Sequence, residues 1–140
     1  MTVTDFLLPT FVLVALAFAL HLMMARERMG ALMSGKVAPK DVDLRQPNWP
    51  ARATQIANAY HNQLELPMLY YVLIAFILIT RVGDILLLVL AWLFVISRLV
   101  HAYIHVTSNN ISWRSKVYGL GLVLLIAMWI IFAVKILTAA

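Results

Sequence analysis

The sequence contains no cysteine, so disulfide bonds, thiolate metal sites and a cysteine nucleophile are excluded. Charged side chains are also scarce: they make up 12% of the 140 residues, against roughly a quarter in an ordinary soluble domain. Hydrophobic residues make up 64%, and this leaves too few polar side chains to cover the surface of a soluble protein. The composition therefore indicates an integral membrane protein, with residues 1–140 as a single domain.

Four apolar stretches follow one another, at about 5–25, 53–80, 84–106 and 115–138. Each is near the roughly 20 residues that a helix needs to cross the hydrocarbon of a bilayer. Neither a basic leader nor a small-residue cleavage site is present at the start, so the first stretch is expected to be a retained helix. Backbone groups cannot stay unpaired in lipid, and the alternation of a barrel strand is missing. The predicted fold class is all-α, an integral membrane four-helix bundle.

Basic residues lie mostly on one side of these four spans. That side carries Arg26, Arg28, Lys36, Lys40, Arg45, Arg52, Arg98, Arg114 and Lys116, and the other carries only Arg81 and Lys135. The positive-inside rule places the polar loop 26–52 and the connection 107–114 in the cytoplasm, with both termini outside. The net charge of +5 is explained by this topology and indicates no nucleic-acid partner. Short loops without targeting features suit a bacterial inner membrane, although an endoplasmic-reticulum protein would look similar.

The second span begins with polar residues at helical spacing. Asn58, His61, Asn62 and Glu65 stand at i, i+3, i+4 and i+7, and so share one face of a helix. Pro67 follows and is expected to bend the helix, because it removes a backbone hydrogen bond and frees a carbonyl near residue 63.

The third and fourth spans also carry polar groups near their cytoplasmic ends. Arg98, His101 and His105 share a face of the third span, and Arg114 and Tyr118 share one on the fourth. An ionisable group deep in a bilayer costs about 2.5–3.5 kcal/mol on insertion scales. Three helices that bring such groups to one level predict a single shared pocket for an anionic ligand.

In this pocket Glu65 is expected to pair with Arg98 or Arg114. Each residue also has a structural explanation. The carboxylate and an arginine can form an ion pair that only joins helices, Arg98 can extend to the headgroups, and Arg114 can serve only to fix the topology.

The segment "HNQLELP" and the residues that follow it resemble a known family, the membrane-associated proteins in eicosanoid and glutathione metabolism (MAPEG). The Asn62 and Glu65 pair has the spacing of that family's second helix. The third and fourth helices of the family have similar spacings to those of Arg98, His101, Arg114, Ser115 and Tyr118. Departures occur at Asn58 and His61, where many glutathione-using members carry arginine, and at His105, where a tyrosine is frequent.

The resemblance implies a homotrimer that holds glutathione between subunits at the cytoplasmic side, as co-substrate of a transferase or peroxidase. Asn62 and Glu65 are expected to contact polar groups of the tripeptide, and Arg114 with Ser115 to face its sulfur as the catalytic residues. A free thiol has a pKa of about 8.5, and a neighbouring cation favours the thiolate. The second substrate is expected to be a small lipophilic electrophile that enters from the bilayer. The other candidate glutathione-binding residues are Arg28, Asn58, His61, Arg98, His101, His105 and Tyr118.

Two other functions are compatible with the same residues. His101 and His105 have a spacing known from metal sites on helices, and His61 with Glu65 could complete a coordination shell. Alternatively, the chain is a non-enzymatic membrane subunit or lipid-binding scaffold that keeps the family architecture without its chemistry.

Overall fold

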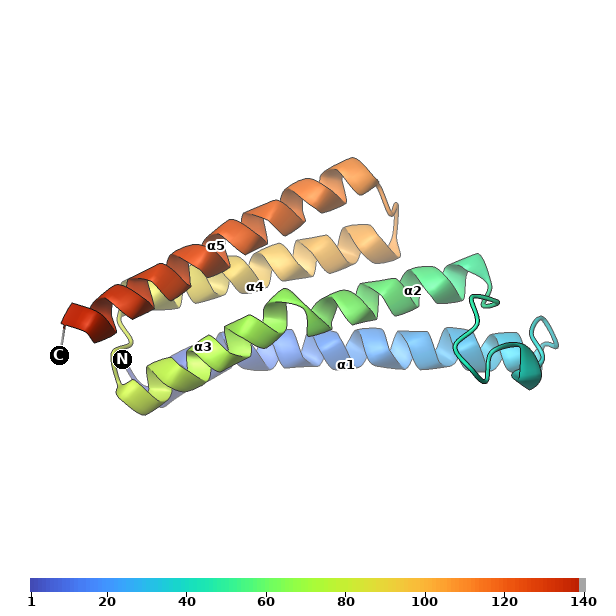
Figure 1. The fold of residues 1–140 in the computed structure, drawn as a ribbon, viewed down its shortest axis with the longest axis horizontal. Helices are drawn as coiled ribbons and strands as arrows, with labels where there is room; N and C mark the ends of the chain where they lie inside the picture. Colours follow the sequence, from blue (N-terminus) through green and yellow to red (C-terminus); the bar gives the residue numbers. More distant parts are fainter. Residues whose placement is uncertain (139–140) are drawn as a thin grey trace.

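The computed structural model describes residues 1–138, and these residues form long helices without strands. The elements are α1 (Val3–Met33), the short 3-10 turn η1 (Pro39–Asp41), α2 (Ala51–His61), the 3-10 turn η2 (Asn62–Leu64), α3 (Leu66–Thr80), α4 (Ile85–Val106) and α5 (Ile111–Thr138). With α2 to α3 counted as one span, four helices are long and apolar enough to cross a membrane. Both termini and the turn 81–84 lie at one end, and the loops 34–50 and 107–110 lie at the other (Figure 1). The prediction of an all-α protein with four apolar helices is confirmed.

Helix α1 is longer than its apolar stretch. It starts with a capping box, in which the Thr2 hydroxyl accepts from the Asp5 backbone amide and the Asp5 carboxylate accepts from the Thr2 amide. The expected end near residue 25 is too early, because the helix continues through the charged residues to Met33. Ser34 caps the end of the helix, and the next residue, Gly35, takes a positive φ of 69°. The last two turns of α1 therefore extend beyond the apolar segment.

The second span is broken, which differs from the expected bent helix. Helix α2 ends at His61, the 3-10 turn η2 follows, and Glu65 leaves the helical conformation with φ −95° and ψ −102°. Pro67 then lies in the first turn of α3, a position where its missing amide is no loss. The proline thus begins a new helix, and the interruption is visible between α2 and α3 in Figure 1.

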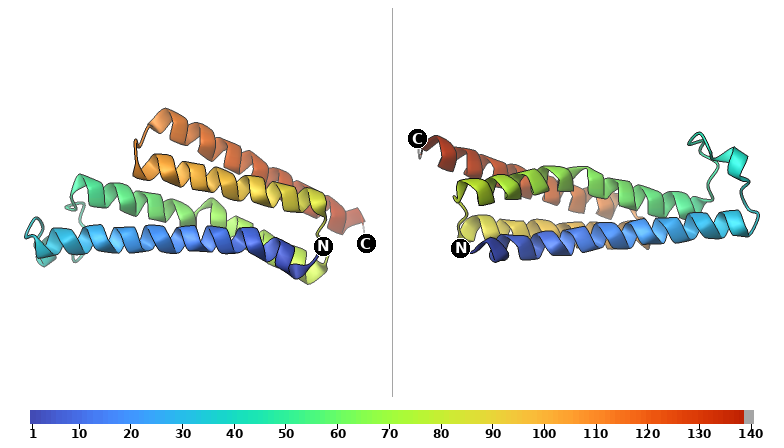
Figure 2. Two further views of the ribbon diagram at one scale, coloured as in Figure 1. Left: turned by 180° about the vertical axis from the view of Figure 1, so that it is seen from behind. Right: turned by 90° about the horizontal axis from the view of Figure 1, so that it is seen from below.

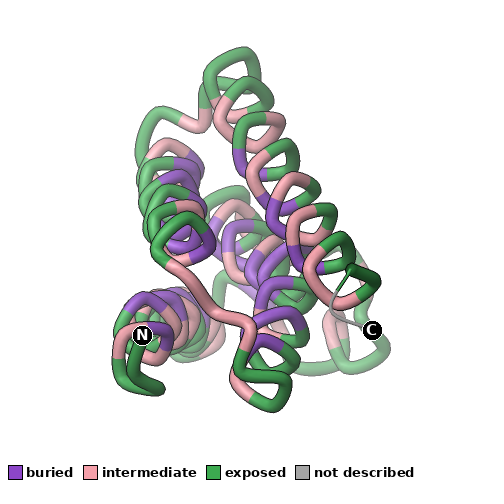
Figure 3. The backbone as a smooth tube through the Cα atoms, turned by 90° about the vertical axis from the view of Figure 1, so that its left-hand side faces the viewer, coloured by how far each residue is buried: buried purple, intermediate pink, exposed green. Residues whose placement is uncertain are grey.

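Helices α4 and α5 form a hairpin that runs at an angle to α1 (Figure 1 and the left view of Figure 2). Helix α1 packs against α2 and α4, and α5 packs against α4 and α3. The buried segments of the helices face one another across the interior (Figure 3). The main core contains Phe6, Leu13, Leu66, Tyr70, Leu73, Ile74, Ile77, Leu87, Ala91, Phe94, Val95, Leu125, Met128 and Phe132. The outward surfaces are large and apolar, as expected of helices that face lipid.

Asp84 connects the start of α4 with the end of α5. Its Oδ1 accepts a hydrogen bond from the Leu87 amide at 2.9 Å and caps α4, and its Oδ2 lies 2.7 Å from the Lys135 ammonium. The hydrogen bond from the Leu87 amide and, to a smaller extent, the contact with the Lys135 ammonium hold the pKa of this carboxyl below its ordinary value of 3.8.

Two replacements of Asp84 distinguish the contribution of the helix cap from that of the ion pair. Asp84→Ala should destabilise the protein by about 1 kcal/mol, the usual value of a lost N-cap. Asp84→Asn keeps a capping oxygen and should cost less, because an exposed ion pair contributes about 0–1 kcal/mol. Since the folded pKa is lowered, the stabilisation is complete above pH 4 and is lost as the pH falls through the folded pKa. Thermal unfolding in detergent at several pH values measures both effects, and equal losses in the two variants would contradict the capping role.

Candidate functional site

A cavity of about 250 Å³ lies where the break in the second span meets α4 and α5. It is lined by Asn62, Glu65, His101, Arg114, Ser115 and Tyr118. All six are candidate residues from the sequence, and they come from three separate spans. The break is what allows this, because the backbone turn at residues 62–65 presents both Asn62 and Glu65 to the same space.

Glu65 is bound by a tyrosine rather than by an arginine. The Tyr118 hydroxyl donates to Glu65 Oε2 at 3.3 Å. The expected ion pair with Arg98 or Arg114 does not form within the chain, since Lys135 with Asp84 is the one ion pair among residues 1–138. Instead, the ring of Tyr118 lies 5.5 Å from the Arg98 Cζ and its hydroxyl bonds the carboxylate, while Arg114 donates to Asn109.

Arg98, on α4, is fully buried and lies next to the break in the second span. Its Nη2 lies 3.4 Å from the Asn62 carbonyl and 3.3 Å from His101 Nδ1. In a continuous helix that carbonyl would accept from the amide of residue 66. The guanidinium replaces this donor, so a residue of α4 satisfies the backbone where the second span opens. Its Nε and Nη1 have no hydrogen-bond partner among the described residues.

Arg114 lies at the start of α5 and is held by the preceding turn. Its Nη1 donates to the Asn109 Oδ1, and Asn109 itself has a positive φ of 50°. Asn109 was not among the residues predicted from the sequence, although an asparagine in a short connection is a common sign of this conformation. Ser115 follows with an exposed side chain, so the cavity has a cation and a hydroxyl at its rim.

A model of the MAPEG family matches residues 6–134, which is nearly the whole chain. The chain belongs to the MAPEG family. No curated protein and no solved structure matched it in the same comparisons. The resemblance stated from the sequence is confirmed, and with four spanning helices it identifies an integral, multi-pass membrane protein of the family for glutathione and eicosanoid metabolism. All six cavity residues lie within the matched range.

Close packing of α5 on α4 positions the cavity of this MAPEG chain. A Cβ atom added to Gly121 would lie 2.9 Å from Ser97 Oγ and 3.9 Å from Arg98 Cδ. Ser97 is buried and donates to the Phe94 carbonyl at 2.6 Å, so it has little room to move. Gly121 thus allows α5 to approach α4 one turn beyond Tyr118.

Other candidate residues of this MAPEG chain lie outside the cavity. Asn58 and His61 are exposed on α2 and do not line the cavity, whereas Asn62 and Glu65 do. The Asn62 side-chain amide still donates to the Asn58 carbonyl at 3.1 Å. His105 is buried beside His101, with 5.6 Å between the ring centroids. Arg28 lies on α1, with its Cζ over the ring of Trp49 from the long loop, 5.0 Å from the ring centroid.

The structure does not support the metal alternative. Within residues 1–138 no three histidine, aspartate or glutamate side chains come together as a possible metal site. His101 Nδ1 is close to the Arg98 guanidinium, and a neighbouring fixed cation disfavours metal binding. His61 is on the outer side of α2 and Glu65 is bound to Tyr118.

Proposed function

We propose that the protein is a glutathione-dependent transferase or peroxidase that activates the thiol at the cavity formed by α4, α5 and the break in the second span. The observation that carries this proposal is the convergence of a carboxylate, a guanidinium and two hydroxyls in one cavity of a MAPEG chain. The end with the loop 34–50 is proposed to face the cytoplasm, because it carries most of the basic residues.

The sulfur is proposed to lie beside Arg114 and Ser115. A cation within about 4–6 Å lowers the pKa of an acid by about 1–3 units, and a shift of about 2 units suffices to convert a thiol of pKa about 8.5 mainly to the thiolate at neutral pH. The thiol proton leaves to water. The thiolate then forms a bond from sulfur to an electrophilic carbon, and the electron pair of the broken bond goes to the leaving group or to the neighbouring atom.

The amine end of glutathione is proposed to lie at Glu65, the one carboxylate of the cavity. An ammonium there would compete with, or add to, the hydrogen bond from Tyr118. Glutathione also has two carboxylates, whereas Arg114 is the one arginine or lysine that lines the cavity. A second cation is therefore required from outside it, and a neighbouring copy of the chain in a homotrimer would supply one.

The exposed polar face of α2 supports such an assembly. Asn58 and His61 lie within a helix counted as part of a spanning segment, yet both are exposed in the single chain. Polar groups at this level face water or protein rather than lipid. A trimer would cover them, while the apolar outer surfaces would let a lipophilic electrophile reach the cavity from the bilayer.

The test is the thiolate absorbance of glutathione bound to the purified protein. Arg114→Ala should remove the absorbance at pH 7 and slow conjugation of a model electrophile about tenfold or more, with recovery as the pH rises toward 8.5, because only the thiol pKa changes. The matched control is Lys116→Ala, which removes a cation from the same turn of α5. Lys116 lies over the ring of Trp113 and does not line the cavity, so this variant should behave as wild type. Equal losses in both variants would contradict the role of Arg114.

The alternative is a non-enzymatic membrane subunit with the same architecture. The observations in its favour are the asparagine and histidine at positions 58 and 61, and the carboxylate of Glu65 already bound by Tyr118. Wild-type protein that shows neither thiolate absorbance nor conjugation would establish this alternative.

A further inference from the structure

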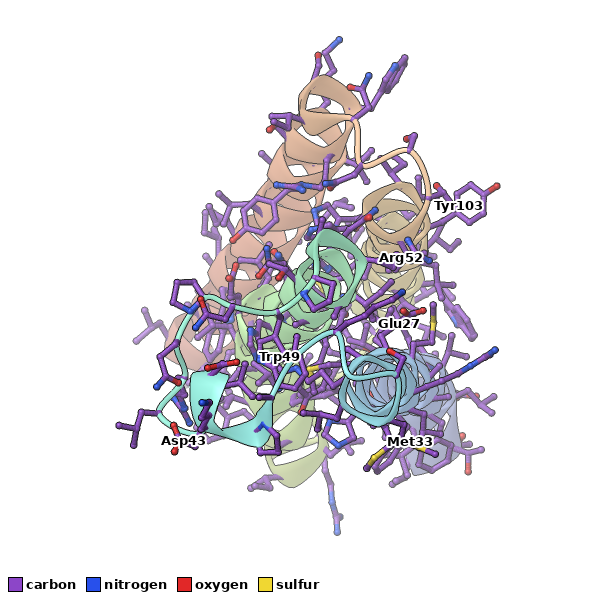
Figure 4. The ribbon with its side chains drawn as sticks, turned by 90° about the vertical axis from the view of Figure 1, so that its right-hand side faces the viewer. Glu27, Met33, Asp43, Trp49, Arg52 and Tyr103 are labelled. Carbon is purple, nitrogen blue, oxygen red and sulfur yellow. The ribbon has the colours of Figure 1, made fainter. Side chains whose placement is uncertain are left out.

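A second polar cavity, of about 420 Å³, lies between the end of α1 and the start of α2. It is lined by Arg26, Glu27, Gly30, Ala31, Ser34, Lys36, Pro50, Arg52 and Ala53. None of these residues lines the cavity at Glu65. Figure 4 looks onto this end of the molecule and shows Glu27 of α1 and Arg52 of α2 on neighbouring elements.

The cavity lies at the level of the lipid headgroups. The twenty residues from Phe6 to Ala25 contain no aspartate, glutamate, lysine or arginine. At 1.5 Å per residue they span about 30 Å, which is the thickness of the hydrocarbon. Arg26 and Glu27 are the next residues, so they stand at the boundary, and the rest of the cavity lies just beyond it.

The charge of the cavity is positive. Arg26, Lys36 and Arg52 contribute three cations against the one carboxylate of Glu27. The Arg52 Nη1 donates to the Val106 carbonyl at 2.6 Å, which fixes this side chain at the end of α4. Arg26 and Lys36 take part in no ion pair among residues 1–138. Two cations at the edge of the membrane are thus left available to a ligand.

We propose that this cavity binds the phosphate of an anionic ligand at the headgroup level, with an anionic phospholipid as the principal source. Guanidinium and ammonium groups are the side chains that bind phosphate oxygens. Basic pockets between spanning helices at the cytoplasmic side suit lipid headgroups. A phosphodiester carries one negative charge, which would offset part of the excess positive charge of Arg26, Lys36 and Arg52. This proposal does not depend on glutathione or on the reaction.

The experiment titrates the full-length protein in detergent with dioleoylphosphatidylglycerol or dioleoylphosphatidylcholine, which share acyl chains and differ in headgroup charge. The phosphatidylglycerol should bind and raise the unfolding temperature more than the phosphatidylcholine. The double variant Arg26→Gln, Lys36→Gln should bind phosphatidylglycerol roughly 30-fold more weakly, because two cations near the surface are lost. Its unfolding temperature in phosphatidylcholine should equal that of wild type.

The matched control removes the same charge from the long loop, in Lys40→Gln, Arg45→Gln, two residues that do not line the cavity. It should keep the wild-type affinity. Glycerol 3-phosphate distinguishes the sources: a saturable effect that the cavity variant lacks assigns the site to soluble phosphate esters, and no effect assigns it to lipid. If the double variant does not fold, each single variant should bind about fivefold more weakly. Equal weakening in cavity and control variants, or no weakening in either, overturns the proposal.

Discussion

Gly121→Val is expected to destabilise the bundle by about 1–3 kcal/mol, the usual cost of added volume at a closely packed contact. The first added carbon already lies 2.9 Å from Ser97 Oγ, and valine adds two methyl groups at this contact. Gly119→Val is the matched control, since a Cβ at Gly119 meets nothing within 4 Å. The control should be neutral or slightly stabilising, because valine is a better helix former than glycine. Thermal unfolding of both variants in the same detergent gives the comparison.

The same pair of variants tests how the cavity is built. Helix α5 carries Arg114, Ser115 and Tyr118, so a displacement of α5 from α4 moves all three relative to Glu65. Gly121→Val should therefore also lose the thiolate absorbance that Gly119→Val retains. Addition of Ser97→Ala removes the nearest atom of the contact and should restore part of the stability. Similar stability for the two glycine variants would show that the α4–α5 contact is not close in the folded protein.

The helices could be predicted because the bilayer allows few alternatives. Long apolar stretches with so little charge have to satisfy their backbone within each segment, and helices do this. The positions of the turns also follow from local residues, such as Asp84 as the cap of α4 and Gly35 after α1. The predicted end of α1, near residue 25, was wrong because it was taken from the apolar stretch alone. The apolar stretch ends near residue 25, but the helix continues through charged residues to Met33.

The break in the second span could not be derived from local sequence. Pro67 predicts a disturbance, and both a bent helix and a new helix satisfy that requirement. The choice depends on a donor from α4, since Arg98 bonds the Asn62 carbonyl from 36 residues away. Periodicity likewise placed Asn58 and His61 with Asn62 and Glu65 on one face. The 3-10 turn at 62–64 and the non-helical Glu65 alter this spacing, and only Asn62 and Glu65 line the cavity.

The residues that line the cavity could be predicted where their side chains lie at helical spacing near the end of a span, as for Arg114, Ser115 and Tyr118. The contacts within it were not. An ion pair was expected for Glu65, but sequence spacing does not show that an aromatic ring lies over the Arg98 guanidinium. The role of Asn109 depends on its backbone conformation and was missed for the same reason.

Arg98→Met is expected to leave the bundle folded and to open the second span locally. The methionine fills much of the volume, and removal of a buried charge offsets part of the lost hydrogen bonding, so the global stability should change little. The Asn62 carbonyl, however, loses its donor. An unsatisfied buried acceptor costs about 1–3 kcal/mol, which corresponds to roughly 5- to 150-fold faster amide exchange in a local opening.

Hydrogen exchange of the amides of residues 62–66 and 68, compared with those in the middle of α4, measures this effect. Ser97→Ala is the matched control, because Ser97 is also buried on α4 but its hydroxyl bonds only the Phe94 carbonyl of its own helix. Exchange at residues 62–66 and 68 should stay at the wild-type rate in Ser97→Ala and rise in Arg98→Met. With its supporting cation removed, Tyr118 should also hold Glu65 less firmly, and the thiolate absorbance should fall. Wild-type exchange in Arg98→Met would mean that the break is fixed by Pro67 and η2 alone, and that the buried guanidinium does not support the cavity.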